Sequence, residues 1–490
     1  MPPKENPYSG MPLGNDIIYY KEKSDVKMNK STISVVDRSD HLLPTILLLA
    51  WPIFLEQVLT SLAQSVDTAM VGSLGANATA AVAISQSPNI LINGIIMALG
   101  IGFTSMVARS VGAKEFERVR LLIRQSLLTI AAVGLPLSLL CFLLARQIPI
   151  WMGAAPDILD TAETYNRILA LSLLFRSLLM VLTAIYRGFG DAKTPMITNI
   201  CINIANVIGN FLLIYPTRTL TLLGLSFTMP GAGLGVTGAA IATSLSATLG
   251  SLALLANCFL RKDAFCISIK DGFRPDWKEL STVTRISLPA MLERFTMSGA
   301  SIVVMSTIAT LGTAAVAANS LAGTAESLSF MPGFAFGTSV TTLVGQSLGA
   351  NREDLAKRYV SLTCRLGSVV MLFMSCVLFF GSRNIISLFT PDLEVIEMGS
   401  ILIKILAIIQ IPQVIAMVYS GALKGAGDTK SPFLIALISM WGVRILGVVV
   451  TVRFLGLGIN AVCVSMCCDN VVRCILFHLR YKKTNWSKTK

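Results

Sequence analysis

Long, nearly uncharged apolar stretches constrain this chain more than any other feature of its sequence. The stretches from Ile123 to Leu144 and from Val236 to Leu260 exceed the ~20 residues that a helix needs to cross a bilayer. Inside lipid every backbone N–H and C=O group must be bonded within the protein, and these stretches lack the apolar and polar alternation of membrane barrel strands. They therefore predict transmembrane helices. A composition of 53% hydrophobic and 14% charged residues agrees with a bilayer environment.

Twelve such helices are predicted, which makes the chain an all-α integral membrane protein. Their approximate ranges are 43–72, 77–106, 121–145, 161–187, 194–215, 236–260, 281–310, 314–345, 358–381, 395–423, 431–453 and 458–480. Basic residues gather in the connections after even-numbered helices and in the carboxyl tail, as Lys114, Lys270 and Lys357 illustrate. By the positive-inside rule, both termini of this multi-pass cell-membrane protein are expected in the cytoplasm. This placement accounts for the formal charge of +13 without nucleic-acid binding.

The sequence contains an internal repeat, because one constant shift superposes most of its two halves. The segment RGFGDAKTP, Arg187 to Pro195, falls on KGAGDTKSP, Lys424 to Pro432. The register changes only near the end, which leaves a longer loop at 216–233 in the first half, expected outside the cell. Six helices in each half predict two pseudo-symmetric six-helix lobes arranged as parallel repeats, with substrate bound between them.

Five segments are predicted along the chain. They are a disordered cytoplasmic tail at 1–42, a first lobe at 43–260, a basic cytoplasmic linker at 261–280, a second lobe at 281–480 and a basic cytoplasmic tail at 481–490.

Four carboxylates fall inside predicted helices, at Glu56, Asp67, Glu293 and Glu326. A carboxylate at the centre of a membrane helix costs about 2.5 to 3.5 kcal/mol on insertion scales, so each is a candidate functional residue. Glu56, Thr60 and Asp67 share one helix face by their spacing. The alternative for Asp67 is an interfacial carboxylate near a helix end, satisfied by water.

Four asparagines recur at helical spacing in the fifth predicted helix. They are Asn199, Asn203, Asn206 and Asn210. Because four amides facing lipid would be very costly, this stripe is expected to face protein or a wet cavity. Amides that serve only as packing contacts between helices are the alternative.

Charged residues of the second half allow a simpler interpretation. Glu293 is followed by Arg294, and Arg444 accompanies Asp469 and Arg473 in the last two predicted helices. Mutual neutralisation of these charges would lower the insertion cost without a role in transport. Glu326 has no adjacent arginine, so it is the favoured candidate for attracting cationic substrates.

Catalytic and metal-binding patterns are missing from the sequence. The ten cysteines lie mostly in apolar segments, and the only histidines are His41 and His478, so no metal site is expected. The sequence offers no HExxH, no Ser/His pair and no GxxxxGK[ST]. Neither a membrane-embedded enzyme, the alternative from another class, nor an ATP-driven pump is therefore predicted.

Several separated motifs, WPIFLEQ, SVDTAMVGSLG and LVGQSLGA, together with the paired GD loops, resemble the multidrug and toxic compound extrusion (MATE) family over residues 43–480. The resemblance implies a twelve-helix, two-lobe antiporter that expels drug-like, often cationic compounds in exchange for protons or sodium. It implies that Asp67 is the coupling-ion carboxylate and that Asn206, Asn210 and Thr243 stand at ion-ligand positions.

The chain departs from two patterns within that family. Archaeal members have a second aspartate where Asn210 stands, so this chain looks closer to the bacterial NorM-like branch. Acids that some NorM-like members carry fall at Met297 and Gln413, which argues against a sodium site of that design in the second lobe.

The predicted function is secondary antiport of small organic, cationic, drug-like compounds against H⁺ or Na⁺. Asp67, Asn206, Asn210 and Thr243 form the predicted ion-coupling site, and the predicted substrate cavity contains Glu56, Gln57, Glu293 and Glu326. No cofactor beyond the coupling ion is expected. The expected partners are small-molecule substrates and the lipid bilayer, without nucleic acid, and the protein is expected to be a monomer. A flippase for a lipid-linked or polar metabolite is the alternative, and it would have extra helices and a strongly cationic cavity.

Overall fold

The structure, a computed structural model, describes residues 41–484 apart from 223, 224, 262, 264, 269 and 271, and also residue 486. Almost all of the predicted tail at 1–42 lies outside the described residues, as do 485 and 487–490 of the predicted carboxyl tail.

The described residues are almost entirely helical. In chain order the elements are α2 (Leu42–Gly72), α3 (Ala76–Gly112), α4 (Phe116–Leu143), α5 (Gln147–Trp151), α6 (Pro156–Phe189), α7 (Lys193–Leu213), β1 (Pro216–Leu222), β2 (Leu225–Ala232), α8 (Gly235–Leu260), α9 (Trp277–Ala309), α10 (Thr313–Gly349), α11 (Glu353–Ser387), α12 (Leu393–Ile408), α13 (Gln410–Gly425), α14 (Lys430–Ser439), η3 (Met440–Ile445), α15 (Leu446–Val449), η4 (Val450–Phe454) and α16 (Ile459–Lys483).

These elements form twelve membrane-spanning rods, if a rod that is divided into several helical segments is counted once. Ten are individually long and apolar enough to cross a bilayer, and the bent pair α12 and α13 adds another. The twelfth is α9, whose 33 residues suffice in length although Glu293 and Arg294 lower its hydropathy. The predicted all-α membrane fold is confirmed.

Several rods differ from their predicted ranges. Helix α4 begins at Phe116, α6 at Pro156 and α11 at Glu353, each some residues before the predicted start. Hydropathy detects the apolar part of a rod and misses the polar turns that continue it. The tenth predicted helix is wrong as a single rod, because it bends by 50° between α12 and α13. The eleventh contains the π-helical segments η3 and η4, which apolar composition does not reveal.

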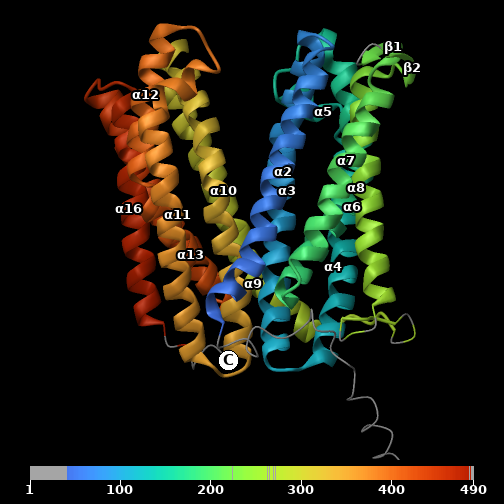
Figure 1. The fold of residues 1–490 in the computed structure, drawn as a ribbon, viewed down its shortest axis with the longest axis vertical. Helices are drawn as coiled ribbons and strands as arrows, with labels where there is room; N and C mark the ends of the chain where they lie inside the picture. The colour runs from blue at the N-terminus through green and yellow to red at the C-terminus, as the bar shows by residue number, and fades with distance from the viewer. Residues whose placement is uncertain are drawn as a thin grey trace, which may run out of the picture.

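The two halves form separate lobes that meet at one end. Figure 1 shows α2 to α8 on one side and α10 to α16 on the other, splayed apart near the β1–β2 hairpin and converging at the opposite end, here called the closed end. There Gly112 of α3 lies against the backbone of Gln346, and Gly349 of α10 lies against the backbone of Arg109. A Cβ on either glycine would clash with the facing carbonyl oxygen, so only glycine allows this approach. The two contacts occupy equivalent positions in the two copies of the repeat.

The first rod of each half crosses into the other lobe at the closed end. Ile46 and Leu49 at the start of α2 belong to a core with Val340 and Tyr359 of the second lobe. In the same way Val283 of α9 joins the core of the first lobe. Both rods contain a proline at equivalent positions, Pro52 and Pro289. Packing therefore interlocks the two lobes at the closed end.

The longer loop predicted at 216–233 forms an antiparallel hairpin of β1 and β2. Its register pairs Pro216 with Ala232 and Leu222 with Leu225, with an irregularity after Pro216. The sequence comparison located this insertion correctly but predicted no strands there.

Candidate functional site

Asp67 of α2 faces two amides of α7. The side chain of Asn210 donates a hydrogen bond to Asp67 Oδ1. When the Asn206 amide nitrogen is turned toward the carboxylate, it lies 2.8 and 3.1 Å from the two oxygens, and its carbonyl accepts from Thr243 Oγ1 of α8 at 3.1 Å. We adopt this orientation for the ionised carboxylate, because the reverse would set the amide oxygen against it. The structure thus brings together the four residues of the predicted ion-coupling site.

Asp67 differs from the other membrane acids because its direct partners are neutral. Asn206 and Asn210 are buried, and Asp67 is half-buried. No lysine or arginine among the described residues lies within 4 Å of its carboxylate, although Tyr165 of α6 is close enough to interact electrostatically. A proton needs only the carboxylate, whereas a hard cation prefers oxygen ligands, which Asn210 Oδ1 and the Thr243 hydroxyl could supply if their side chains turned toward Asp67. The arrangement could hold either ion.

Glu56, which lies on α2 closer to the closed end than Asp67, is held in an ion pair. Arg187 Nη2 lies 2.7 Å from its Oε2, and Asn199 Nδ2 donates to its Oε1 at 2.8 Å. Glu56 is buried, and the neighbouring Gln57 is half-buried. The substrate role assigned to these two residues remains a prediction.

The asparagine stripe of α7 faces α2. This agrees with the expectation that the stripe faces protein or a wet cavity and not lipid. Asn199 binds Glu56, and the pair Asn206 and Asn210 binds Asp67. Between them, Asn203 Nδ2 is a buried donor without a partner in the described part of the chain. The stripe therefore serves both as a helix contact and as the wall of the Asp67 site.

Glu293 of α9 is paired with Lys424 of α13 at 2.9 Å, not with Arg294 as the sequence suggested. Adjacent residues on a helix point about 100° apart, so they rarely face each other. The pair is the counterpart, in the second copy of the repeat, of Glu56 and Arg187. The repeat alignment thus contained the correct partner.

Glu326 of α10 was expected to have no arginine nearby, and the structure corrects this. Gln413 Nε2 donates to its Oε1 at 3.4 Å, and Arg444 of η3 is near enough for its charge to act on it. Arg444 also pairs at 2.7 Å with Asp469, which Arg473 contacts at 2.9 Å. The predicted neutralisation among these three residues is confirmed. Arg444 thus lies near Glu326 as well, although its direct ion pair is with Asp469, and adjacent sequence positions could not reveal this proximity.

Sequence reasoning missed one polar face of α6. Tyr165, Arg176 and Arg187 recur at an equal spacing that corresponds to three helical turns. Tyr165 lies near Asp67, and Arg187 pairs with Glu56. This spacing was the available signal, since the two acids of α2 are separated by the same interval.

Comparison with known proteins places this geometry in context. The MatE family model matches residues 52–212 and 289–450, so its two copies begin at the equivalent prolines of α2 and α9. A "Probable multidrug resistance protein NorM" from Thermotoga maritima is 28% identical over 90% of this chain and 92% of its own length. The "Uncharacterized transporter YisQ" of Bacillus subtilis is 26% identical over 89% and 94%.

Solved structures share the fold. One described as "Crystal structure of MATE in the bent conformation" has a TM-score of 0.85 at 22% identity, covering 94% of this chain and 99% of that one. Another, "Outward-facing conformation of a multidrug resistance MATE family transporter of the MOP superfamily", has a TM-score of 0.84 at 22% identity, covering 94% and 100%.

Proposed function

Because the chain belongs to the MatE family of membrane transporters and is similar to its NorM-like members, we propose that it is a secondary active antiporter that exports small organic, cationic, drug-like compounds in exchange for H⁺ or Na⁺. Relatives named as multidrug resistance proteins support export of such compounds. The observation that carries the coupling mechanism is the Asp67 carboxylate, which is held by neutral amides.

Coupling requires a group whose charge can be compensated by a bound ion and then released. Glu56 and Glu293 already have cationic partners at 2.7 and 2.9 Å, so neither needs an exchangeable ion. Asp67 has only amide donors, and a membrane-embedded anion without a cation is costly. A proton or Na⁺ bound there removes that cost, and its loss restores the anion.

Transport also requires the closed end and the splayed end to alternate. In the positive-inside orientation the closed end is cytoplasmic, so the helices of the two lobes diverge toward the outside (Figure 1). Inward opening must separate Gly112 from Gln346 and Gly349 from Arg109. It must also break the bond from Gln346 Nε2 to the Gly188 carbonyl, 3.0 Å long. Ion exchange at Asp67, on the rod that crosses between lobes, can bias this equilibrium.

The test compares Asp67→Asn with wild type in proteoliposomes under an imposed pH gradient and then an imposed Na⁺ gradient. Asp67→Asn should insert normally, because it replaces a half-buried charge with a neutral group of similar shape. Gradient-driven efflux should fall to background while substrate binding in detergent persists and loses its dependence on pH or Na⁺. Asp160→Asn, whose side chain is 88% exposed, is the matched control and should transport normally.

Efflux by Asp67→Asn at nearly the wild-type rate against a gradient would show that another group couples the ion. Failure of both gradients to drive wild-type efflux would remove the antiport proposal and favour the flippase alternative. The twelve rods counted among the described residues speak against that alternative, which was expected to add helices.

A further inference from the structure

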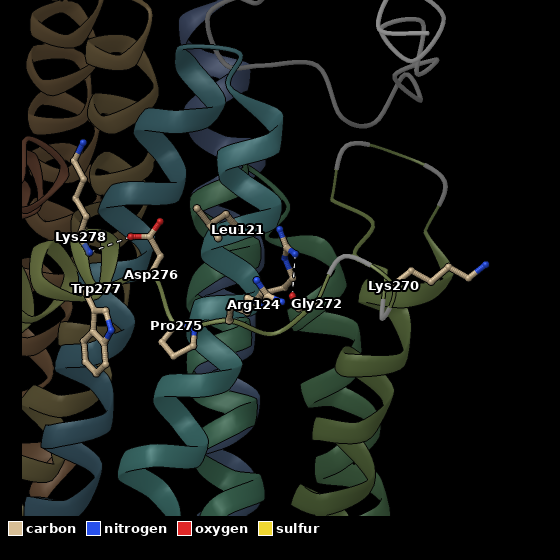
Figure 2. A pocket seen from close by; sticks show the side chains of 9 residues that line it. Leu121, Arg124, Lys270, Gly272, Pro275, Asp276, Trp277 and Lys278 are labelled. Atoms are coloured by element: carbon tan, nitrogen blue, oxygen red, sulfur yellow. Dashed lines mark hydrogen bonds between the residues drawn. The ribbon is translucent and has the colours of Figure 1, made fainter. Parts of the chain in front are cut away.

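A basic hollow of about 800 Å³ lies at the closed end, between the first turns of α4 and the segment leading into α9 (Figure 2). Its lining includes Arg124 of α4, Lys270 and Arg274 of the connecting segment, and Lys278 of α9, beside the carboxylate of Asp276. Four cations against one carboxylate make the hollow strongly positive, which favours an anionic ligand.

The hollow is built by specific contacts to the backbone of the connecting segment. Gln125 Nε2 donates to the Arg274 carbonyl at 2.8 Å, and its Oε1 accepts from the Asp276 N–H at 3.1 Å. Arg124 Nη1 donates to the Gly272 carbonyl at 3.0 Å. These bonds hold the backbone of residues 272–276 on α4 and so keep Arg274 beside Arg124.

The single carboxylate of the lining already has a role. Asp276 Oδ1 accepts from the backbone N–H groups of Lys278 and Glu279 at 3.0 and 3.2 Å and caps the first turn of α9. In contrast, the side chains of Lys270, Arg274 and Lys278 are exposed and make no hydrogen bond or ion pair with the residues described. Three cations therefore remain available to a ligand.

Trp277 places the hollow at the level of the membrane surface. Its side chain is 78% exposed, although tryptophan is a costly residue to leave in water. Figure 2 shows its ring pointing along the helices toward the bilayer-spanning part, while the Lys278 side chain points the opposite way. Tryptophan prefers the interface between headgroups and acyl chains. Cations just beyond such a ring lie at the depth of lipid phosphates.

We propose that this hollow binds the phosphate-bearing headgroup of an anionic phospholipid from the leaflet at the closed end. Basic pockets between membrane helices on the cytoplasmic side are suited to such headgroups. The lipid would join α4 of the first lobe to the start of α9, the rod that continues into the second lobe. Its occupancy would therefore stabilise the closed end.

The triple variant Lys270→Gln, Arg274→Gln, Lys278→Gln tests the site. The purified full-length protein is titrated in detergent micelles with phosphatidylglycerol, phosphatidylcholine or inorganic phosphate, and bound lipid is counted by native mass spectrometry. Each cation near an anionic lipid strengthens binding by roughly fivefold, so the triple variant should bind phosphatidylglycerol at least tenfold more weakly. The matched control, Lys430→Gln, Lys482→Gln, Lys483→Gln, removes the same charge from exposed positions at the same end and should bind it as wild type does.

Equal binding of phosphatidylglycerol by both triple variants, or equal binding of phosphatidylcholine and phosphatidylglycerol by wild type, would overturn the proposal. Saturation by inorganic phosphate at concentrations that displace phosphatidylglycerol would assign the hollow to a small anion instead of a lipid. If the triple variant does not insert, the salt dependence of lipid binding by the wild-type protein tests the proposal instead. Raising the salt from 50 mM to 500 mM shortens the Debye length about 3-fold, so wild-type binding of phosphatidylglycerol should weaken at least tenfold. Binding that does not depend on salt would reject the site.

Discussion

The closed end depends on two glycines that no other residue can replace, and Gly112→Ala tests that dependence. The added Cβ would meet the Gln346 carbonyl, and because this is backbone of α10, no side-chain rotation relieves the clash. Overpacking of this kind costs about 1 to 3 kcal/mol, which corresponds to a 5- to 150-fold shift away from the closed arrangement. Asp67 lies far along α2 from this contact, so the ion site itself should remain intact.

Accessibility of a cysteine at the closed end reports the shift. Ser105, which is fully buried on α3, is replaced by cysteine, and its labelling by a membrane-impermeant thiol reagent is followed by peptide mass spectrometry, so that the ten native cysteines do not interfere. Labelling should accelerate 5- to 150-fold in the Gly112→Ala background. Gly323→Ala on α10 is the control, because nothing lies within 4 Å of the position its Cβ would take.

Gly349→Ala should produce the same effect as Gly112→Ala, since it faces the Arg109 carbonyl in the symmetry-related contact. The reasoning is refuted if Gly112→Ala labels no faster than Gly323→Ala while both insert normally. In that case the closed end would be held by other contacts, such as the crossing rods, and the glycines would only permit them.

Two further predictions concern the paired acids. Glu56→Gln leaves Arg187 buried without its carboxylate and should destabilise the protein by about 3 to 5 kcal/mol, measured as a loss of thermal stability in detergent. Glu117→Gln, in a pair whose acid is 85% exposed, should cost less than about 1 kcal/mol, and equal losses would contradict the assignment of a buried pair. Glu326→Gln should weaken export of cationic compounds more than of neutral ones in the proteoliposome assay. An equal loss for both, with poor expression, would instead show a structural role beside Arg444.

Much of the architecture could be predicted because it depends on periodicities that a sequence displays directly. Hydropathy gave the predicted helices, and the internal repeat grouped them into two halves, so that Glu293 and Lys424 stand at the positions equivalent to Glu56 and Arg187. The facing stripes of α2 and α7 likewise brought Asp67 next to Asn206 and Asn210. Each of these features repeats along the chain at a constant interval.

Hydropathy alone could not reveal where the rods break. It averages over the bend between α12 and α13, which lies four residues before Pro412, a residue that cannot donate to the Ile408 carbonyl, and over the π-helical turns of η3. Arg444, which pairs with Asp469 at 2.7 Å, lies within this π-helical segment. Tyr165 and Arg176 were missed because single polar residues in α6 form a pattern only when their spacing is compared with that of α2.

The crossing of α2 and α9 has a consequence for biosynthesis. When the first six rods have left the ribosome, Ile46 and Leu49 have no second-lobe core to enter, and the first-lobe core still lacks Val283. The amino-terminal half therefore remains incompletely packed in the membrane until the seventh rod, α9, has been inserted.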